Sequence, residues 1–129
     1  MQFHTEGYGD IDIEATAHTL VLYEQEFKSD LIKDVFGKRE QVKDADGSTV
    51  VLFDYTVDNW NDELKALWAM AKTANDIAND AGEVAPKDRI TSYTKWVKGL
   101  GKVNMRDVAN AVVSCCMDGF FHTGAAVSE

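Results

Sequence analysis

The chain has 129 residues, which is the size of one ordinary domain, and it is 45% hydrophobic and 27% charged with a single proline. This balance is typical of a globular domain and argues against collagen-like, linker-like or fully disordered chains. The formal net charge of −9 argues against a free-standing nucleic-acid-binding protein, which usually carries the opposite sign.

The first residues alternate in the manner of a strand with one solvated face. Ile11 and Ile13 are separated by acidic residues, which is the period-two pattern of a half-buried strand. The segment Gln2–Thr5 is placed to pair with it through the turn Gly7–Gly9. We therefore expect a short antiparallel hairpin over residues 1–14.

A helical segment follows over residues 16–36. Its apolar residues recur every three or four positions, as in one stripe of an amphipathic helix. Ser29 followed by Asp30 is typical of a helix cap, and Gly37 is a stop signal. We therefore expect two helices with a bend at Lys28–Ser29. The stripe consists of Ala17, Leu20, Tyr23, Phe27 and Leu31.

Residues 38–57 are the least determined part of the sequence. A turn signal over residues 43–47 precedes a strand-prone run over residues 49–53. A second hairpin and an ordered loop both fit this pattern.

The next helix is expected over residues 59–81, with Asn59 as its N-cap and Gly82 as its end. Its apolar stripe becomes rich in alanine, so another helix is able to approach it closely. Met70 and Ile77 lie off this stripe and indicate a second, smaller contact face. The main stripe consists of Trp60, Leu64, Leu67, Trp68, Ala71, Ala74 and Ala78.

Two further helices are expected over residues 91–98 and 105–120. Gly99 and Gly101 end the first of them, and Asn104 caps the second. The last helix carries a continuous apolar stripe from residue 105 to residue 120.

These elements together predict an α+β protein that is mainly α, a small helical domain with a short N-terminal antiparallel β-hairpin. We expect one globular domain over residues 1–121 and a flexible tail over residues 122–129.

The charge is unevenly distributed along the chain. Residues 1–63 hold 15 acidic and 5 basic side chains, whereas residues 64–129 hold 7 acidic and 8 basic ones. Within the second half, residues 87–106 carry six basic side chains against one acidic. A solvated face that balances the acidic half is the simpler interpretation of this basic strip, and a docking strip for an acidic partner is the alternative.

Several features favour a cytosolic protein. Residues 1–9 have neither the basic nor the apolar region of a signal peptide, and no apolar stretch approaches the ~20 residues of a membrane span. Cys115 and Cys116 are adjacent, and a reduced pair is favoured over a redox switch. We expect neither a membrane nor a nucleic-acid partner.

The residue types that carry out catalysis or bind metals do not occur at spacings typical of a catalytic or metal site. His4, His18 and His122 lie in unrelated contexts, outside any metal-binding spacing. Ser114 and Cys115 fall within a predicted helix, and no histidine or acidic residue lies at a spacing that would indicate an activating base for either nucleophile. We therefore expect a protein without catalytic residues, metal or cofactor, that is, not an enzyme.

A series of short motifs runs through the chain, namely Ala15–Thr19, Tyr23, Phe27, Asp30–Asp34, Leu67–Ala74, Ser92, Trp96, Val97 and Val103–Val108. This series resembles the tail assembly chaperones of long-tailed bacteriophages and prophages. In one branch of that family, a short strand runs into an Ala-Thr-Ala-x-Thr segment, followed by Tyr, Phe and an Asp-Leu-hydrophobic step. An alanine-rich central helix and a short helix with a tryptophan come before the last helix.

The resemblance implies a protein that binds the long, helical tape measure protein before the tail tube polymerises around it. Some members of the family are also made as a longer, frameshifted form that recruits tail tube subunits. A helical domain with spare apolar surface and strong negative charge suits this role, because it covers apolar helical stripes and keeps the complex soluble. We also expect self-association into a homo-oligomer through helix faces.

The candidate partner-contact residues are apolar side chains left off the main stripes. For each of them an ordinary core position or an oligomer interface is the competing interpretation. Two other functions stay open, namely a structural tail or connector subunit retained in particles and a small enzyme or metal-dependent regulator. The candidates are Met70, Ile77, Tyr93, Trp96 and Phe121.

Overall fold

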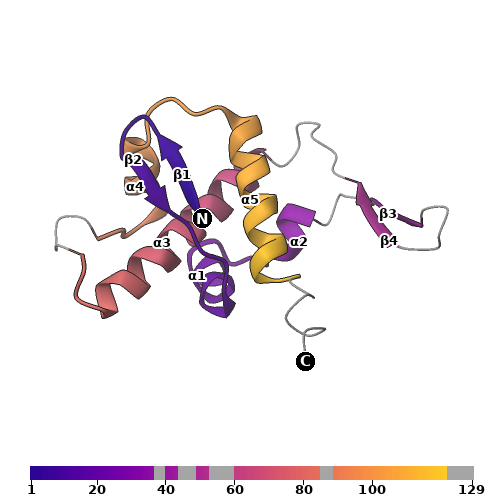
Figure 1. Ribbon diagram of the computed structural model, residues 1–129, viewed down its shortest axis with the longest axis horizontal. Helices are drawn as coiled ribbons and strands as arrows, with labels where there is room; N and C mark the ends of the chain where they lie inside the picture. The colour runs from indigo at the N-terminus through magenta and orange to yellow at the C-terminus, as the bar shows by residue number, and fades with distance from the viewer. Residues whose placement is uncertain (37–39, 44–48, 53–59, 85–88, 122–129) are drawn as a thin grey trace.

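The computed structural model describes residues 1–36, 40–43, 49–52, 60–84 and 89–121, and the expected tail over residues 122–129 lies outside these ranges. The described chain is mainly helical with an antiparallel hairpin at its N-terminus, which confirms the predicted α+β, mainly α fold. Helix α3 (Trp60–Asp80) runs through the body, and the other helices and the N-terminal hairpin pack around it (Figure 1).

The N-terminal hairpin forms where the alternation predicts it. Strand β1 (Gln2–Thr5) pairs with β2 (Gly9–Asp12), with Phe3 opposite Ile11. Gly9 has a φ of 69°, a left-handed conformation that glycine adopts without strain. The hairpin turns its acidic residues outward, while Ile11 is half-buried.

Helix α1 (Ala17–Phe27) and helix α2 (Leu31–Phe36) are separated by the bend that the sequence predicts. Lys28 ends α1 in a left-handed conformation with a φ of 55°, and its N–H donates to the Glu24 carbonyl at 2.8 Å. The Asp30 carboxylate accepts from the Lys33 N–H at 3.1 Å and so caps α2. The bend at Lys28–Ser29 is therefore confirmed.

Strands β3 (Glu40–Lys43) and β4 (Thr49–Leu52) pair antiparallel, with Glu40 opposite Leu52. Of the two alternatives for this part of the chain, the hairpin is the one observed. It stands to the side of the helical body (Figure 1).

Helix α3 is the centre of the core. Its residues 66–70 are all buried, a run of well over one turn, so packing surrounds the helix on every side at this level. The helix ends at Asp80, and the chain turns away at Gly82, whose φ is 76°, where the Glu83 N–H donates to the Ala78 carbonyl at 2.9 Å. This is the glycine stop that the sequence predicts.

Helices α4 (Tyr93–Gly99) and α5 (Met105–Gly119) follow, and the predicted Asn104 cap of α5 is confirmed. The Ser92 hydroxyl accepts from the Lys95 N–H at 3.3 Å. The Asn104 side chain accepts from the N–H groups of Arg106 and Asp107, which fixes the start of α5. None of the described helices is both long enough and apolar enough to span a lipid bilayer.

Aromatic side chains lock α1, α3 and α4 together. The Phe27 ring lies 4.8 Å from Tyr23, 5.5 Å from Trp68 and 5.1 Å from Tyr93, measured between ring centroids. Burying side chains of this size stabilises the fold by about 1.5–3 kcal/mol each, and edge-on ring pairs add to that. Trp68 is thus a core residue.

Candidate functional site

A groove follows the C-terminal half of α3. Its volume is about 690 Å³, and its floor is made by Ala71, Ala74, Asn75 and Ala78. These four positions have the spacing i, i+3, i+4 and i+7, which is one stripe of a helix. Two other hollows, of about 400 and 530 Å³, are smaller.

The groove exists because the side chains of the apolar stripe become smaller toward the C-terminal end of α3. The N-terminal half carries Leu64, Leu67 and Trp68, whose side chains fill the space beside the helix. The C-terminal half carries methyl groups at the same positions, so the elements around it leave the space open. The alanine-rich run from which the sequence predicts a close approach is therefore the floor of this groove.

One wall of the groove is the N-terminal hairpin, and the other is the segment 89–91 with helix α4. The hairpin contributes Tyr8, Ile11 and Asp12. The rings of Tyr8 and Trp96 are stacked, with centroids 6.0 Å apart, and the Tyr8 hydroxyl donates to the Trp96 carbonyl at 2.7 Å. These two residues therefore join one wall to the other.

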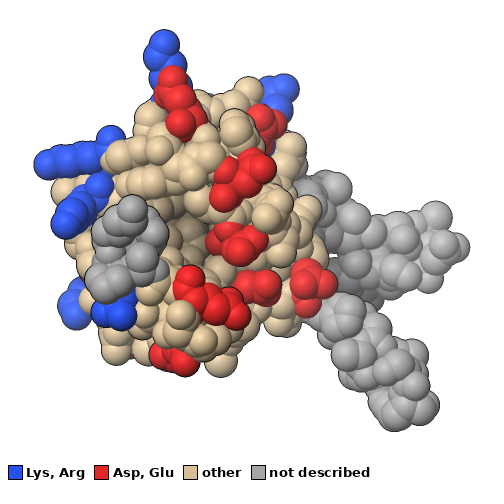
Figure 2. Space-filling model, turned by 60° about the vertical axis from the view of Figure 1, so that its left-hand side comes forward, with Lys and Arg blue, Asp and Glu red and all other residues tan. Residues whose placement is uncertain are grey.

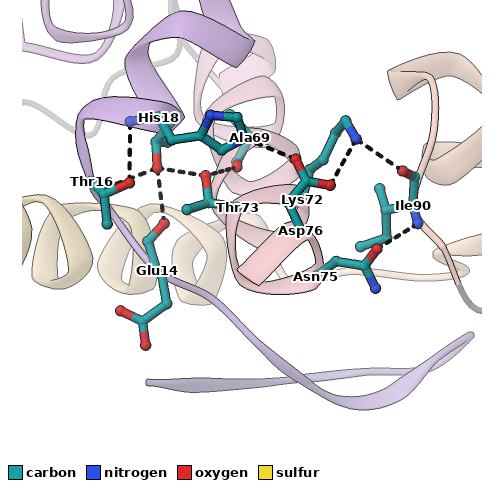
Figure 3. Close-up of polar contacts among 10 residues, drawn as sticks. Glu14, Thr16, His18, Ala69, Lys72, Thr73, Asn75, Asp76 and Ile90 are labelled. Atoms are coloured by element: carbon teal, nitrogen blue, oxygen red, sulfur yellow. Dashed lines mark hydrogen bonds and ion pairs between the residues drawn. The ribbon is translucent and has the colours of Figure 1, made fainter. Parts of the chain in front are cut away.

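Polar contacts fasten the second wall to α3 (Figure 3). The Lys72 ammonium donates to the Ile90 carbonyl at 3.2 Å, and the Ile90 N–H donates to the Asn75 side-chain oxygen at 2.9 Å. Lys72 also pairs with Asp76 at 3.1 Å, and Asp76 in turn contacts His18 of α1 at 2.9 Å. One network thus connects α1, the floor helix and the wall.

The tryptophan of the floor helix makes a further link to that wall. The Trp68 ring N–H donates to the Thr91 carbonyl at 3.2 Å. The Ile90 N–H and the carbonyls of Ile90 and Thr91 therefore already have hydrogen-bond partners within the chain. The wall consequently offers side chains, rather than these backbone groups, to a binding partner.

Charge is divided across this face of the molecule. Asp12 belongs to the hairpin wall and Glu83 follows the end of α3, whereas Arg89 and Lys95 belong to the opposite wall. Figure 2 shows basic side chains gathered along one side of this hollowed face and acidic side chains beside the hollow. In the part of the chain that the structure describes, neither Arg89 nor Lys95 forms a salt bridge.

The five contact residues predicted from the sequence are not brought together. Met70 is 0% exposed, so it belongs to the core and is not available to a partner. Trp96 is 5% exposed and lines the groove, and half-buried Tyr93 sits in the aromatic cluster. Ile77 and Phe121 are 54% and 44% exposed, away from the groove.

Polar residues of the groove were missed by the sequence reasoning. Asn75 falls on the alanine stripe, where a single polar residue between alanines marks the place at which the stripe leaves the core. Arg89 and Lys95 are part of the basic strip, and their position on one wall gives that strip a local role. Lys87, another member of the strip, lies outside the described residues.

The two cysteines are both buried and unbridged, as the reduced pair predicts. Burial, together with the negative charge of Glu14, raises the pKa of the Cys115 thiol to about 11. A thiol with so high a pKa is a poor nucleophile at neutral pH.

Tyr23 is the other strongly perturbed group. Burial, a 2.9 Å hydrogen bond from its hydroxyl to Asp34, and the nearby carboxylates of Asp62 and Glu63 all raise its pKa. The hydroxyl therefore stays protonated and serves as a structural donor. Among the described residues, no three histidine, cysteine or acidic side chains are grouped so as to hold a metal ion.

Comparisons of the chain with models of protein families, with curated proteins and with solved structures found no match.

Proposed function

We propose that this chain is a tail assembly chaperone of a long-tailed bacteriophage or prophage, which binds the tape measure protein and keeps it soluble while the tail is built in the host cytoplasm. The motif series from residue 15 to residue 108 supports the family. The observation that carries the proposed activity is the groove over Ala71, Ala74 and Ala78.

A groove of this kind suits a helix. Its floor is a stripe of small side chains, which allows the backbone of a second helix to approach α3 closely. A tape measure protein is expected to be a long helical chain with apolar stripes, and such stripes aggregate unless they are covered.

The charge of the chain supports the same role. With a net charge of −9, a complex that contains several copies of this chain carries a large negative charge. Mutual repulsion between such complexes opposes their aggregation.

Two exposed apolar residues outside the groove fit self-association, which is part of the proposal. Ile77 lies on α3, and Phe121 follows α5, where its ring packs against Phe36 with centroids 5.5 Å apart. Both are available to a second copy of the chain or to a partner, whereas Met70 is not.

The direct experiment is co-expression with the tape measure protein encoded in the same gene cluster. We expect the soluble fraction of that protein to rise, and we expect the two chains to elute together in size-exclusion chromatography. An unrelated acidic protein of similar size, expressed at the same level, is the control. If both chains are well expressed and the soluble fraction does not change, the proposal is wrong.

Mass spectrometry of purified particles separates this role from that of a structural subunit. A chaperone leaves the particle, so its peptides should be absent or rare relative to those of the tail tube protein. Abundant peptides in intact particles would identify a tail or connector subunit instead.

A further inference from the structure

We propose that the groove on α3 binds an amphipathic helix whose two flanks carry charges of opposite sign, basic on the side of the hairpin and acidic on the side of α4. This inference rests on the proposed function and specifies the chemistry of the segment that is bound.

The floor selects the apolar face of the occupant. Ala78 and Ile11 are half-buried and present apolar surface to the groove, while Ala71, Ala74 and Trp96 line it more deeply, at 1%, 8% and 5% exposed. Side chains of the size of Leu or Met, spaced at i, i+3, i+4 and i+7, fill such a groove and bury apolar area on both chains.

The second wall offers no backbone edge at Ile90 and the Thr91 carbonyl to which an extended strand could add. A strand that adds to a wall needs free backbone donors and acceptors on it. Here the Ile90 N–H is bonded to Asn75, and the Ile90 and Thr91 carbonyls accept from Lys72 and Trp68. A helix satisfies its own backbone groups internally, so it makes no such demand.

The charges on the two walls determine which charges the two flanks of a bound helix should carry. Arg89 and Lys95 line the second wall, and both are exposed. Asp12 is exposed and lines the hairpin wall, where its carboxylate accepts a hydrogen bond from the Gln2 side chain at 3.3 Å. An occupant with acidic residues toward Arg89 and Lys95 and basic residues toward Asp12 gains on both sides, and one with mixed flanks meets like charges on both.

The same division of charge sets the direction of the occupant. A helix that lies with its apolar stripe on the floor exchanges its left and right flanks when it is turned end for end. Only one of the two directions therefore places acidic residues toward Lys95 and basic residues toward Asp12.

Two synthetic peptides test the inference. Both have about 18 residues, or five helical turns, and the same composition with leucines at i, i+3, i+4 and i+7. The first has Lys on one flank and Glu on the other, and the second mixes Lys and Glu on both flanks. Fluorescence anisotropy at low salt measures the binding of each to the full chain.

We expect the peptide with sorted flanks to bind roughly fivefold more tightly or better, because several rim pairs each add a modest amount. The advantage should shrink as salt is added, since these charges are exposed. Equal affinities at low salt, or no binding of either peptide, would overturn the inference.

Matched variants locate the binding. Lys95→Glu should remove the advantage of the sorted peptide, whereas Lys98→Glu, on the same helix but outside the groove lining, should keep it. Ala78→Phe should weaken both peptides about tenfold by filling the groove, while Ala81→Phe, exposed and outside the lining, should not. Circular dichroism confirms that each variant is folded. Identical losses in the paired variants would place the binding elsewhere.

This outcome is separable from that of the proposed function. If Ala78→Phe fails to bind the peptides yet still keeps the tape measure protein soluble, the groove is not the docking site and the proposed function stands. If the wild-type chain binds the sorted peptide but does not solubilise the tape measure protein, the groove binds helices and the proposed function is wrong.

Discussion

The hydroxyl oxygens of Thr19 and Thr73 lie 2.6 Å apart, buried between α1 and α3. Thr19 also contacts the Glu14 carbonyl at 3.1 Å, and Thr73 contacts the Ala69 carbonyl at 2.7 Å. Each hydroxyl has a single proton, so when one threonine donates to the other, only the second remains able to donate to its carbonyl. The hydrogen bonding of each hydroxyl therefore depends on the other. This pair fixes the start of α1 against the middle of the floor helix.

Replacing one member of this pair should destabilise the fold. Thr73→Val keeps the shape of the side chain but removes the hydroxyl, so we expect the free energy of unfolding to fall by about 1–3 kcal/mol. Urea denaturation measures the loss. Thr73→Ser keeps the hydroxyl and should cost less, and equal losses for Val and Ser would show that the hydrogen bond is not the cause.

The turn of the N-terminal hairpin should be intolerant of a side chain at one glycine and tolerant at another. A methyl group at Gly7 would collide with the carbonyl oxygen of Gly99, at the place where the Gly7 N–H donates to the Leu100 carbonyl at 3.0 Å. Gly7→Ala should therefore lower the free energy of unfolding by about 1–3 kcal/mol or more.

Gly9→Asn is the matched control for that variant. A Cβ at Gly9 meets nothing within 4 Å, and asparagine tolerates the left-handed conformation found there. Gly7→Ala should also alter the fluorescence of Trp96, because Tyr8 of the same turn stacks on it. Equal stability of the two variants would contradict this description of the hairpin wall.

The second wall should loosen when its hold on α3 is removed. Asn75→Ala takes away the acceptor of the Ile90 N–H, so we expect a loss of about 1–2 kcal/mol in the free energy of unfolding. We also expect amide exchange at Ile90 to accelerate, as measured by NMR. Asn79→Ala, on the same helix and outside the groove lining, should leave the exchange at Ile90 unchanged.

Alkaline pH should destabilise the chain through Cys115. Its pKa is about 11 in the folded state against 9.0 for an ordinary thiol, so the unfolded chain loses the proton first. The contribution of this group is fully present below pH 9 and is lost as the pH rises toward 11. The loss amounts to about 2–3 kcal/mol in all.

Unfolding measured between pH 8 and pH 10 tests this dependence, against Cys115→Ala as the control. The variant keeps every other titrating group and lacks only the Cys115 thiol. It should therefore lose less stability over this range than the wild type. Tyr23, whose pKa is likewise raised, should add to the loss above pH 10. Parallel pH profiles for the wild type and the variant would contradict the assignment.

Local signals were enough to predict most of the fold. The acidic alternation around Ile11 identified the hairpin, and the sequence around Lys28–Ser29 identified the bend between α1 and α2. Gly82 and Asn104 marked the end of one helix and the start of another. Each of these signals acts through a short-range backbone preference or a capping hydrogen bond, so the sequence around it is sufficient.

The site depended on contacts between distant parts of the chain. Met70 lies off the apolar stripe, which left a partner contact and a core position both open, and packing around α3 at that level buries it. Conversely, Ala74 and Ala78 lie on the stripe, yet their small side chains leave a groove. Helical periodicity gives the direction of a side chain, and only the neighbouring elements decide whether that direction is filled.

Photo-crosslinking from the wall of the groove is the most direct test of the central claim that α3 holds a helix of the tape measure protein. A photoreactive residue replaces Lys95 in one variant and Lys98 in another, and each is co-expressed with the tape measure protein. We predict crosslinks to the tape measure protein from position 95 and few from position 98. Crosslinks from position 98 alone, or only to a second copy of this chain, would contradict the claim.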